Sequence, residues 1–463
     1  MTEQLKLKLN DSKATRWGAL VIVAFTMMAA YYVNDVVAPL KTMLETDLAW
    51  SSTDFGFFTG GYSFLKVFFL MLIWGGLILD RFGIRFTGKL ATILMVGGTA
   101  LEYYAMTGLA GADATLFGIN EIFGYKTGVF VAFAGYSIFG VGAEVAGITV
   151  SKIIAKWFKG KELATAMGVQ VALARIGSQA GYAVAIPLAR AFGISTPVLL
   201  GLVLLLGGMI AFFVFAVMDK KLDKQMEAAA IAAGTEDEEE KFSFKDVKNI
   251  LVNPGFWLIA LLCVLFYSCV FPFQKFASEL MIIKYGINEN VAGTFAGLPA
   301  LGALILTPVF GGFIDKRGKS ASIMLLGSAM LICVHFIYAI PDINYWLVAI
   351  VLMIILGIAF SLVPSAMWPA VAKIFPVSQL GTAYALIFFI QNIGLWGIPT
   401  LIGWVLDAYC ISGKKPDGTN MYDYTVPMCI FTGIACLSLI VALLLKKADK
   451  KYGYKLEEPN IQK

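Results

Sequence analysis

Two charged residues, Glu144 and Arg175, lie inside neighbouring apolar stretches that a short basic segment joins. Glu144 precedes Lys156 by 12 residues, and Arg175 follows Lys161 by 14 residues. At a helical rise of about 1.5 Å per residue, both charges lie roughly 18–21 Å from the joining segment. A glutamate accepts hydrogen bonds from an ammonium, and an arginine grips a carboxylate through two parallel bonds. An acid and a base at matching depth on adjacent helices therefore predict a binding site for a small zwitterion.

The alternative is an ion pair between Glu144 and Arg175 that only ties the two helices together. A charge at the centre of a bilayer costs about 2.5–3.5 kcal/mol on insertion scales, so two such charges indicate a function. Both interpretations hold if the protein alternates between two states. Lys66 lies at a similar depth in an earlier apolar stretch. Three roles are open for Lys66: a second ligand for a carboxylate, a lysine that extends to the membrane surface, or a partner of Glu144.

These charges belong to a chain that is too apolar for a soluble globular protein. Of its 463 residues, 59% are hydrophobic and only 14% are charged. Apolar runs of about 20 residues, each long enough to cross a bilayer, recur along nearly the whole chain. The pattern predicts an all-α membrane protein with twelve transmembrane helices, at residues 17–39, 55–79, 86–107, 128–151, 163–190, 196–218, 255–279, 291–314, 320–340, 345–371, 379–409 and 424–446.

The composition excludes several classes of function. The six cysteines show no CxxC spacing and there is a single histidine, so we expect neither disulfides nor a metal site. No nucleophile–base set or phosphate-binding loop is visible, so we expect neither an enzyme nor a cofactor. The net charge of +5 comes from basic residues in short loops, which does not indicate a nucleic-acid partner.

The charges of the loops predict the orientation in the membrane. Basic residues precede the first apolar run, follow the last one and occupy alternate loops, whereas the other loops are acidic or poor in charge, with Lys414 and Lys415 as the main exception. By the positive-inside rule, both termini lie in the cytoplasm. The one extended polar segment, residues 219–253, contains EDEEE at 236–240 and ends in an amphipathic stretch. We expect a mostly flexible cytoplasmic linker with a short surface helix, which separates residues 1–218 from residues 254–463.

The two halves are related by an internal repeat. GLILDRFGIR at residues 76–85 recurs as GFIDKRGKS at residues 312–320. A second match aligns residues 140–177 with residues 357–394 without a gap. Parallel six-helix repeats are typical of secondary transporters that rock two bundles around a site at the membrane midplane. The repeat therefore predicts two pseudo-symmetric six-helix bundles.

The repeat breaks its symmetry at the two central charges. Ser361 stands opposite Glu144, and Asn392 stands opposite Arg175. Since the second half folds without charge at these positions, the asymmetry indicates contact with substrate. Polar and aromatic residues of the second half can complete the site, although such side chains on membrane helices more often pack or anchor. From these we select Trp368, Tyr384 and Asn392.

The repeated loop carries a candidate gate. Its glycines permit a tight chain reversal, and its acid can face a helix N-terminus or a neighbouring base and so hold the cytoplasmic side shut in one state. The alternative is that its charges only set the topology. The residues of this gate motif are Gly76, Asp80, Arg81, Gly83 and Arg85 in the first copy and Asp315 and Lys316 in the second.

Five further polar residues lie inside or at the ends of apolar runs. Asp35, Lys275 and Glu279 fall near outer helix ends, where a gate or interface role is favoured over substrate contact. Lys275 and Glu279 are four residues apart and can pair with each other. Glu102 and His335 are the remaining groups that can carry a proton, although a packed interior histidine is the favoured interpretation of His335.

The repeated gate loop is similar to the signature of the major facilitator superfamily, which the whole chain resembles. Within that superfamily, WFKGKEL (157–163), GVQVALARIGS (168–178) and QLGTAYALIFFIQNIGL (379–395) resemble the lysosomal dipeptide transporter branch, a group of dipeptide uniporters. The resemblance implies that Glu144 holds the dipeptide amine and Arg175 its carboxylate. The ExxER motif of proton-coupled peptide transporters is missing from the first apolar run, which argues against that family's mechanism.

We therefore expect a carrier that moves dipeptides across a membrane by alternating access, with the lipid bilayer and a small molecule as its partners. A proton-coupled symporter of another small organic anion or amino acid is the first alternative. A non-transporting membrane sensor is an alternative from another class, against which the duplicated gate loop argues. The N-terminal segment shows no acidic dileucine signal, so we expect a prokaryotic-type relative in the plasma (inner) membrane, acting as a monomer.

Overall fold

The computed structural model describes residues 8–111, 114–158, 161–233 and 244–459, which are almost entirely helical. The long helices are α1 (Lys13–Val36), α3 (Ser52–Phe68), α4 (Met71–Thr107), α5 (Thr127–Trp157), α6 (Leu163–Phe192), α7 (Thr196–Ala233), α9 (Pro254–Tyr285), α11 (Leu298–Arg317), α12 (Ser320–Ala339), α13 (Trp346–Ile374), α14 (Val377–Tyr409) and α15 (Thr425–Tyr452). The short ones are η1 (Leu9–Asp11), η2 (Ala38–Leu40), α2 (Lys41–Leu48), α8 (Phe244–Val252) and α10 (Glu289–Ala296). Two antiparallel hairpins complete the structure: β1 (Glu121–Ile122) with β2 (Tyr125–Lys126), and β3 (Ile411–Lys414) with β4 (Asn420–Tyr422).

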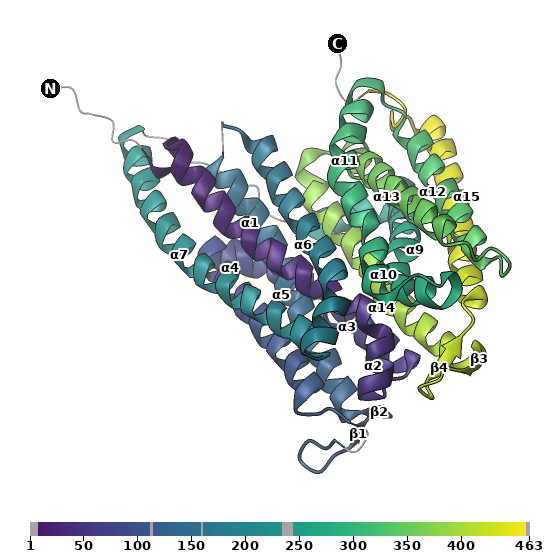
Figure 1. Cartoon of the computed structure of the whole chain (residues 1–463). Coiled ribbons are helices and arrows are strands. Elements are labelled where there is room, and N and C mark those ends of the chain that lie inside the picture. The colour runs from purple at the N-terminus through teal and green to yellow at the C-terminus, as the bar shows by residue number, and fades with distance from the viewer. Residues whose placement is uncertain (1–7, 112–113, 159–160, 234–243, 460–463) are drawn as a thin grey trace.

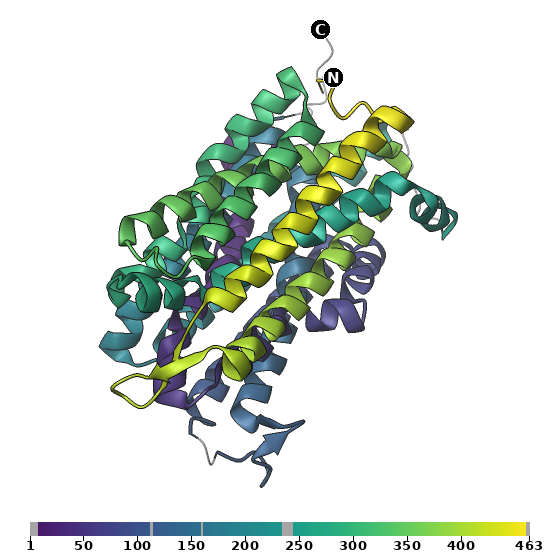
Figure 2. The ribbon, with the colours of Figure 1, turned by 90° about the vertical axis from the view of Figure 1, so that its right-hand side faces the viewer.

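The helices form two bundles that lie side by side (Figure 1). The first bundle contains α1 to α7, and the second contains α9 to α15. Helix α1 begins and α15 ends at the same end of the molecule, which we call the terminal face, and both β-hairpins lie at the opposite end, which we call the hairpin face. Figure 2, turned by 90°, also shows the terminal face and the hairpin face at opposite ends of the molecule. The predicted all-α fold of two bundles is thus confirmed.

Nine helices among the described residues are long and apolar enough to cross a membrane, and the count is ten if α3 and α4 form one bent span. Helix α4 contains two segments of opposite direction. Gly75 packs against Val145 and Asp80 pairs with Lys152, so the first segment runs parallel to α5. Gly98 packs against Phe139, and Leu109, just after the helix, packs against Gly128, so the later segment runs antiparallel to α5. The break between them is Gly83, at φ +74°. This reversal occurs where the sequence predicts it and is consistent with twelve spans.

The expected linker is partly helical. Helix α7 continues past residue 218 to Ala233, because Asp219 is held against α5. One carboxylate oxygen of Asp219 accepts hydrogen bonds from Lys156 at 2.7 Å and from the indole of Trp157 at 2.9 Å. The expected short helix before residue 254 is present as α8, whereas EDEEE at 236–240 lies outside the described residues. The division of the chain into three parts at these boundaries stays a prediction.

The bundles meet along a seam between α3 and α14. Gly56 packs against Pro399 and Gly403, and further along Gly60 packs against Trp396. Glycines spaced by four residues on one helix let two helix backbones approach closely, which is how membrane helices pack. The seam fixes the depth at which residues of α3 face the second bundle.

The seam predicts a position-dependent effect of adding one methyl group. A Cβ at Gly56 would lie 2.4 Å from the carbonyl oxygen of Pro399, whereas a Cβ at Gly397 would meet nothing within 4 Å. We expect Gly56→Ala to destabilise the protein by about 1–3 kcal/mol through overpacking. Gly397→Ala is the matched control, since both changes favour the helix equally. Equal melting temperatures for the two purified variants would contradict the seam.

Candidate functional site

Glu144 is bound by Lys66 and Tyr62 near the middle of the first bundle. The ammonium of Lys66 on α3 lies 3.3 Å from Oε1 of Glu144 on α5, and the hydroxyl of Tyr62 donates to the same oxygen at 3.1 Å. The Lys66 side chain is fully buried, whereas that of Glu144 is 36% exposed. The Lys66 ammonium also lies 3.4 Å from the centre of the Tyr62 ring. Of the three roles considered for Lys66, this conformation shows the pairing with Glu144.

Arg175 on α6 lies at the boundary between the bundles. Its guanidinium is 5.8 Å from the ring centre of Tyr31 on α1 and 4.9 Å from that of Phe360 on α13. Within the described part of the chain, no ion pair joins Arg175 to Glu144 or to any other acid. In this conformation the acid and the base are therefore not locked to each other.

Aromatic residues of the second bundle continue from Arg175. Phe360 contacts Tyr267 edge-on, with ring centres 6.3 Å apart, and Tyr267 lies 6.5 Å from Trp368. Trp368 contacts Tyr384 edge-on at 5.8 Å, and the Tyr384 hydroxyl donates to the Trp368 carbonyl at 3.0 Å. The predicted residues Trp368 and Tyr384 thus form one aromatic cluster linked through Tyr267 and Phe360 to Arg175. Sequence reasoning did not single out Phe360, because one phenylalanine among 35 carries no distinguishing signal.

Asn392 has a different position from these aromatics. It is 3% exposed, and its side-chain oxygen accepts from the hydroxyl of Ser63 at 2.8 Å. Its side-chain nitrogen donates to the carbonyl of Phe388 at 2.9 Å. In this conformation Asn392 joins α14 to α3 across the seam, so substrate contact by Asn392 stays a prediction. Ser63 was not identified from the sequence.

The gate motif lies at the terminal face, where its charges pair within the first bundle. Asp80 pairs with Lys152 of α5 at 3.1 Å, and Arg85 pairs with Asp223 of α7 at 3.0 Å. Arg81 lies over the neighbouring Phe82 ring, and a Cβ at Gly76 would meet nothing within 4 Å. The first copy of the motif therefore ties the turn inside α4 to α5 and α7.

The second copy of the motif is covered by the C-terminal segment. Gly318, the counterpart of Gly83, has φ +71°, and a Cβ there would meet the backbone of Glu457 and Glu458. The amide of Ser322 donates to the Glu457 carboxylate at 2.8 Å. Asp315 is partly buried and Lys316 is exposed. The two copies thus have different partners.

The start of α1 is held at the terminal face by charges of the segment before α6. Arg16 pairs with Glu162 at 2.9 Å, and Lys161 pairs with Asp11 at 2.8 Å. The hydrogen bond from Lys161 holds the pKa of the Asp11 carboxyl below its usual value. All ion pairs found at this face among the described residues join groups of one bundle.

The hairpin face, in contrast, is closed by ion pairs between the bundles. Lys41 on α2 is 1% exposed and lies 2.6 Å from both Glu45 and Glu279, the latter on α9. Lys415 of the β3–β4 hairpin lies 3.8 Å from Glu279, and the Tyr424 hydroxyl donates to the same glutamate. We call Lys41, Glu45, Glu279, Lys415 and Tyr424 the hairpin-face lock. The sequence favoured a gate or interface role for Glu279 but did not identify its partners Lys41, Lys415 and Tyr424, because they are far from Glu279 in the chain.

Two further contacts cross between the bundles near this face. Lys275 of α9 pairs with Asp35 of α1 at 3.1 Å, and Arg190 of α6 pairs with Glu289 of α10. The expectation that Lys275 pairs with Glu279 is therefore wrong. Each finds a stronger partner on the first bundle, since closure of this face brings Asp35 and Lys41 within reach.

Other buried polar groups lie apart from the Glu144 cluster. Glu102 is fully buried, and neither of its carboxylate oxygens has a hydrogen-bond partner among the described residues. His335 packs between the rings of Phe273 and Phe431, at 4.9 and 5.3 Å. Over the described ranges, no group of three or more His, Cys, Asp or Glu side chains could hold a metal ion.

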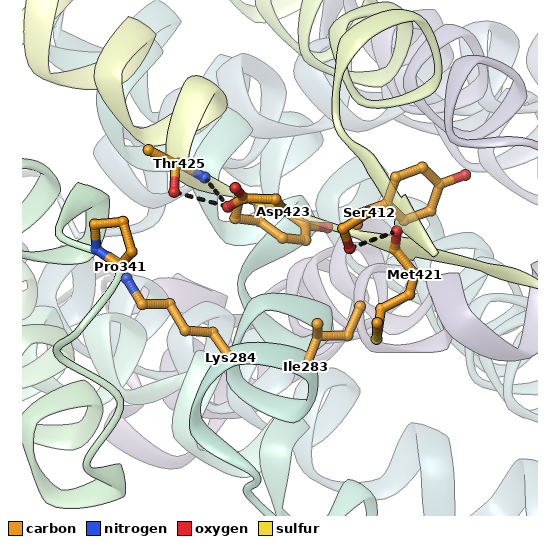
Figure 3. A pocket seen from close by; sticks show the side chains of 9 residues that line it. Ile283, Lys284, Pro341, Ser412, Met421, Asp423 and Thr425 are labelled. Atoms are coloured by element: carbon orange, nitrogen blue, oxygen red, sulfur yellow. Dashed lines mark hydrogen bonds between the residues drawn. The ribbon is translucent and has the colours of Figure 1, made fainter. Parts of the chain in front are cut away.

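A pocket of about 290 Å³ opens at the hairpin face of the second bundle (Figure 3). Its two charged residues already have partners: Lys284 donates to the carbonyls of Tyr338 and Ile340, and Asp423 accepts from the amide and hydroxyl of Thr425. Since these groups are already satisfied and Glu144 and Arg175 do not line it, this crevice is not the predicted site.

The sequence and the fold can now be compared with known proteins. The model of the Major Facilitator Superfamily matches residues 20–399 and 276–458. The chain belongs to this superfamily. Its fold is similar to that of the nucleoside transporter NupG, with a TM-score of 0.68, 12% identity and coverage of 92% of this chain and 98% of that one. The xylose transporter XylE from E. coli, in its inward-open conformation, gives a TM-score of 0.66 at 15% identity, covering 93% and 96%.

Curated relatives share more of the sequence than these structures do. The lysosomal dipeptide transporter MFSD1 of Homo sapiens is 29% identical over 454 residues, covering 95% of this chain and 88% of the relative. The protein of the same name from Gallus gallus is 33% identical over 287 residues, covering 59% and 62%. The superfamily member described here is thus a multi-pass membrane protein that acts on a small-molecule substrate.

The hairpin-face lock predicts a large effect of one lysine. Lys41→Met leaves Glu45 and Glu279 buried together without their shared ammonium, and breaking a buried ion pair costs about 3–5 kcal/mol. We expect a clear fall in the melting temperature of the purified protein. Lys414→Met is the matched control, because Lys414 is exposed and bonds only Asn420. If the two variants melt alike, the lock does not hold this conformation together.

Proposed function

We propose that this protein is a secondary transporter that moves dipeptides across a membrane by alternating access. The observation that carries the proposal is the separation of Glu144 from Arg175. Each is partly exposed, and neither neutralises the other. A zwitterion can therefore place its ammonium at Glu144 and its carboxylate at Arg175. The curated relatives named as dipeptide transporters support this choice of zwitterion.

The surroundings of the two charges suit a peptide. Arg175 rests against the faces of Tyr31 and Phe360, which leaves the guanidinium edge available for a carboxylate. Trp368 and Tyr384 extend this aromatic surface within the second bundle. Aromatic walls accept side chains of different shape without requiring particular hydrogen bonds. We therefore assign binding of the peptide side chains to this cluster.

The contrast between the two faces supports alternating access. Among the described residues, ion pairs between the bundles close the hairpin face, whereas those found at the terminal face stay within one bundle, which favours access to the site from the terminal face. The opposite state requires the hairpin-face lock to break and the bundles to meet at the gate motif. Asp80, Arg81 and Arg85 lie where they can exchange their present partners for groups of the second bundle, and Asp315 and Lys316 occupy the matching turn.

The loop charges support an orientation with the terminal face in the cytoplasm. The protein then lies in the plasma (inner) membrane with both termini inside, and presents its site to the cytoplasm in this conformation. It acts as a monomer, because a complete site is built from the two bundles of one chain.

A second candidate is a carrier of another small organic anion or amino acid. The observation that favours it is the net charge of the site residues. Lys66 already neutralises Glu144, so Arg175 contributes a net positive charge that a carboxylate alone can satisfy.

The site predicts loss of transport when either charge is removed. Glu144→Gln and Arg175→Ala should each lower dipeptide uptake into proteoliposomes by at least about thirtyfold, since a charge-assisted pair desolvated in a membrane is worth roughly 2–5 kcal/mol. The purified variants should keep the elution profile of the parent. Glu121→Gln, which makes the same acid-to-amide change on exposed β1, should transport normally. Normal uptake by either site variant would remove the assignment.

Blocking either charge of the ligand should have a matching effect. We expect a free dipeptide to raise the melting temperature of the purified protein, and the same dipeptide with an acetylated amine or an amidated carboxylate to raise it much less. Loss of one charged contact costs about 1.4 kcal/mol or more, which weakens binding at least tenfold. Stabilisation by an amine-blocked peptide equal to that by the free one would favour the organic-anion alternative.

A further inference from the structure

The buried ammonium of Lys66 has an unusual place in the proposed cycle. Its side chain is fully buried, and its partners in the described structure are the Glu144 carboxylate, at 3.3 Å, and the face of Tyr62. A lysine that extends to the membrane surface would expose its ammonium, so that explanation does not apply. Lys66 lies in the last turn of α3, whose free carbonyl groups also favour a cation.

The same carboxylate is the proposed receptor for the ammonium of the substrate. Lys66 and Tyr62 both bond Oε1 of Glu144, so an arriving ammonium meets an acid that is already neutralised. A substrate can bind strongly there only if it displaces Lys66. The ammonium groups of lysine and of a peptide are chemically alike, so the exchange replaces one pair by an equivalent one.

We propose that Lys66 is a tethered substitute for the substrate ammonium, which neutralises Glu144 in the empty carrier and so allows that carrier to reorient without cargo. The inference rests on the proposed function. When a dipeptide binds, its ammonium takes Glu144, and the released Lys66 joins Arg175 in binding the peptide carboxylate. When the dipeptide leaves, Lys66 returns to Glu144.

The charge of the site supports this role. Glu144, Lys66 and Arg175 together carry one net positive charge, and a bound zwitterion does not change that sum. The empty and loaded carriers therefore present the same charge to the bilayer when the bundles rock. Without Lys66, the empty carrier would have to close around an unpaired carboxylate, which is expensive in a medium of low dielectric.

The chain geometry lets Lys66 move between two partners. Helix α3 ends at Phe68, two residues after Lys66, and Leu70 has φ +52° before α4 begins. Because α3 stops two residues after Lys66, its flexible side chain can change partners without disturbing a continuous helix.

Two transport assays distinguish reorientation of the empty carrier from reorientation of the loaded carrier. Exchange of labelled for unlabelled dipeptide across a proteoliposome membrane requires only the loaded carrier to reorient. Net uptake into liposomes without internal peptide also requires the empty carrier to return. We expect Lys66→Met to lower net uptake at least about tenfold more than it lowers exchange, because only the empty carrier then contains an unpaired Glu144. Lys66→Arg, which keeps the charge, should restore the parental ratio of the two rates.

The outcomes are distinguishable from failure of the proposed function. If the parent protein exchanges no dipeptide, the proposed function fails, whatever Lys66 does. Suppose that the parent transports. If Lys66→Met then lowers exchange and net uptake by the same factor, or lowers neither rate, Lys66 does not substitute for the substrate ammonium. Should Lys66→Met not fold, Lys66→Gln keeps a hydrogen bond to Glu144 without the charge and must show the same split. Lys414→Met on the hairpin controls for loss of a lysine elsewhere.

Discussion

The structure depends on how it neutralises charge inside an apolar medium. An unpaired carboxylate at mid-depth is costly in a membrane protein, and the chain reduces this cost at Glu144 by placing Lys66 and Tyr62 on the neighbouring helix. Arg175 meets the same constraint differently, through two aromatic faces that lower the cost of a cation without providing an anion. The site is therefore stable when empty and still able to accept a ligand.

The same constraint acts at the hairpin face with the opposite result. There Lys41 is held between two glutamates from different bundles, and the hairpin adds Lys415. A network of this kind is strong only while water is excluded, so it favours one closed arrangement over partly open ones. Opening exposes all its members to solvent together, where each is hydrated separately. A lock of paired charges thus suits a face that must be either fully closed or fully open.

The pseudo-symmetry of the halves separates scaffold from site. The copies of the gate loop both turn at a glycine with positive φ, Gly83 and Gly318, because the chain reversal requires it. The central positions have no such backbone constraint, and there the halves diverge. Glu144 and Arg175 in the first half correspond to Ser361, which bonds its own helix, and Asn392, which bonds Ser63 across the seam. The second bundle contributes aromatic surface where the first contributes charge.

Much of this could be predicted from the sequence, because hydrophobic length, glycine at the reversal and an internal repeat are local signals. Apolar runs identified the helices, and the isolated charges of Glu144, Arg175 and Lys66 stood out against them. The length of α7 could not be predicted, since Asp219 resembles a helix boundary in the sequence and its partners Lys156 and Trp157 are identified only in the fold. Phe360 and Ser63 could not be identified from the sequence, because their roles depend on which residues contact them in the fold.

The sequence by itself determined which residues must find a partner, because a charge within an apolar run is costly wherever it points. Only the tertiary structure decided which partner each one has. Glu144 is paired with Lys66 and not with Arg175, and Lys275 with Asp35 and not with Glu279. The physical reason is that pairing depends on distances of a few ångströms between helices, and those distances are set by packing along the whole length of both bundles.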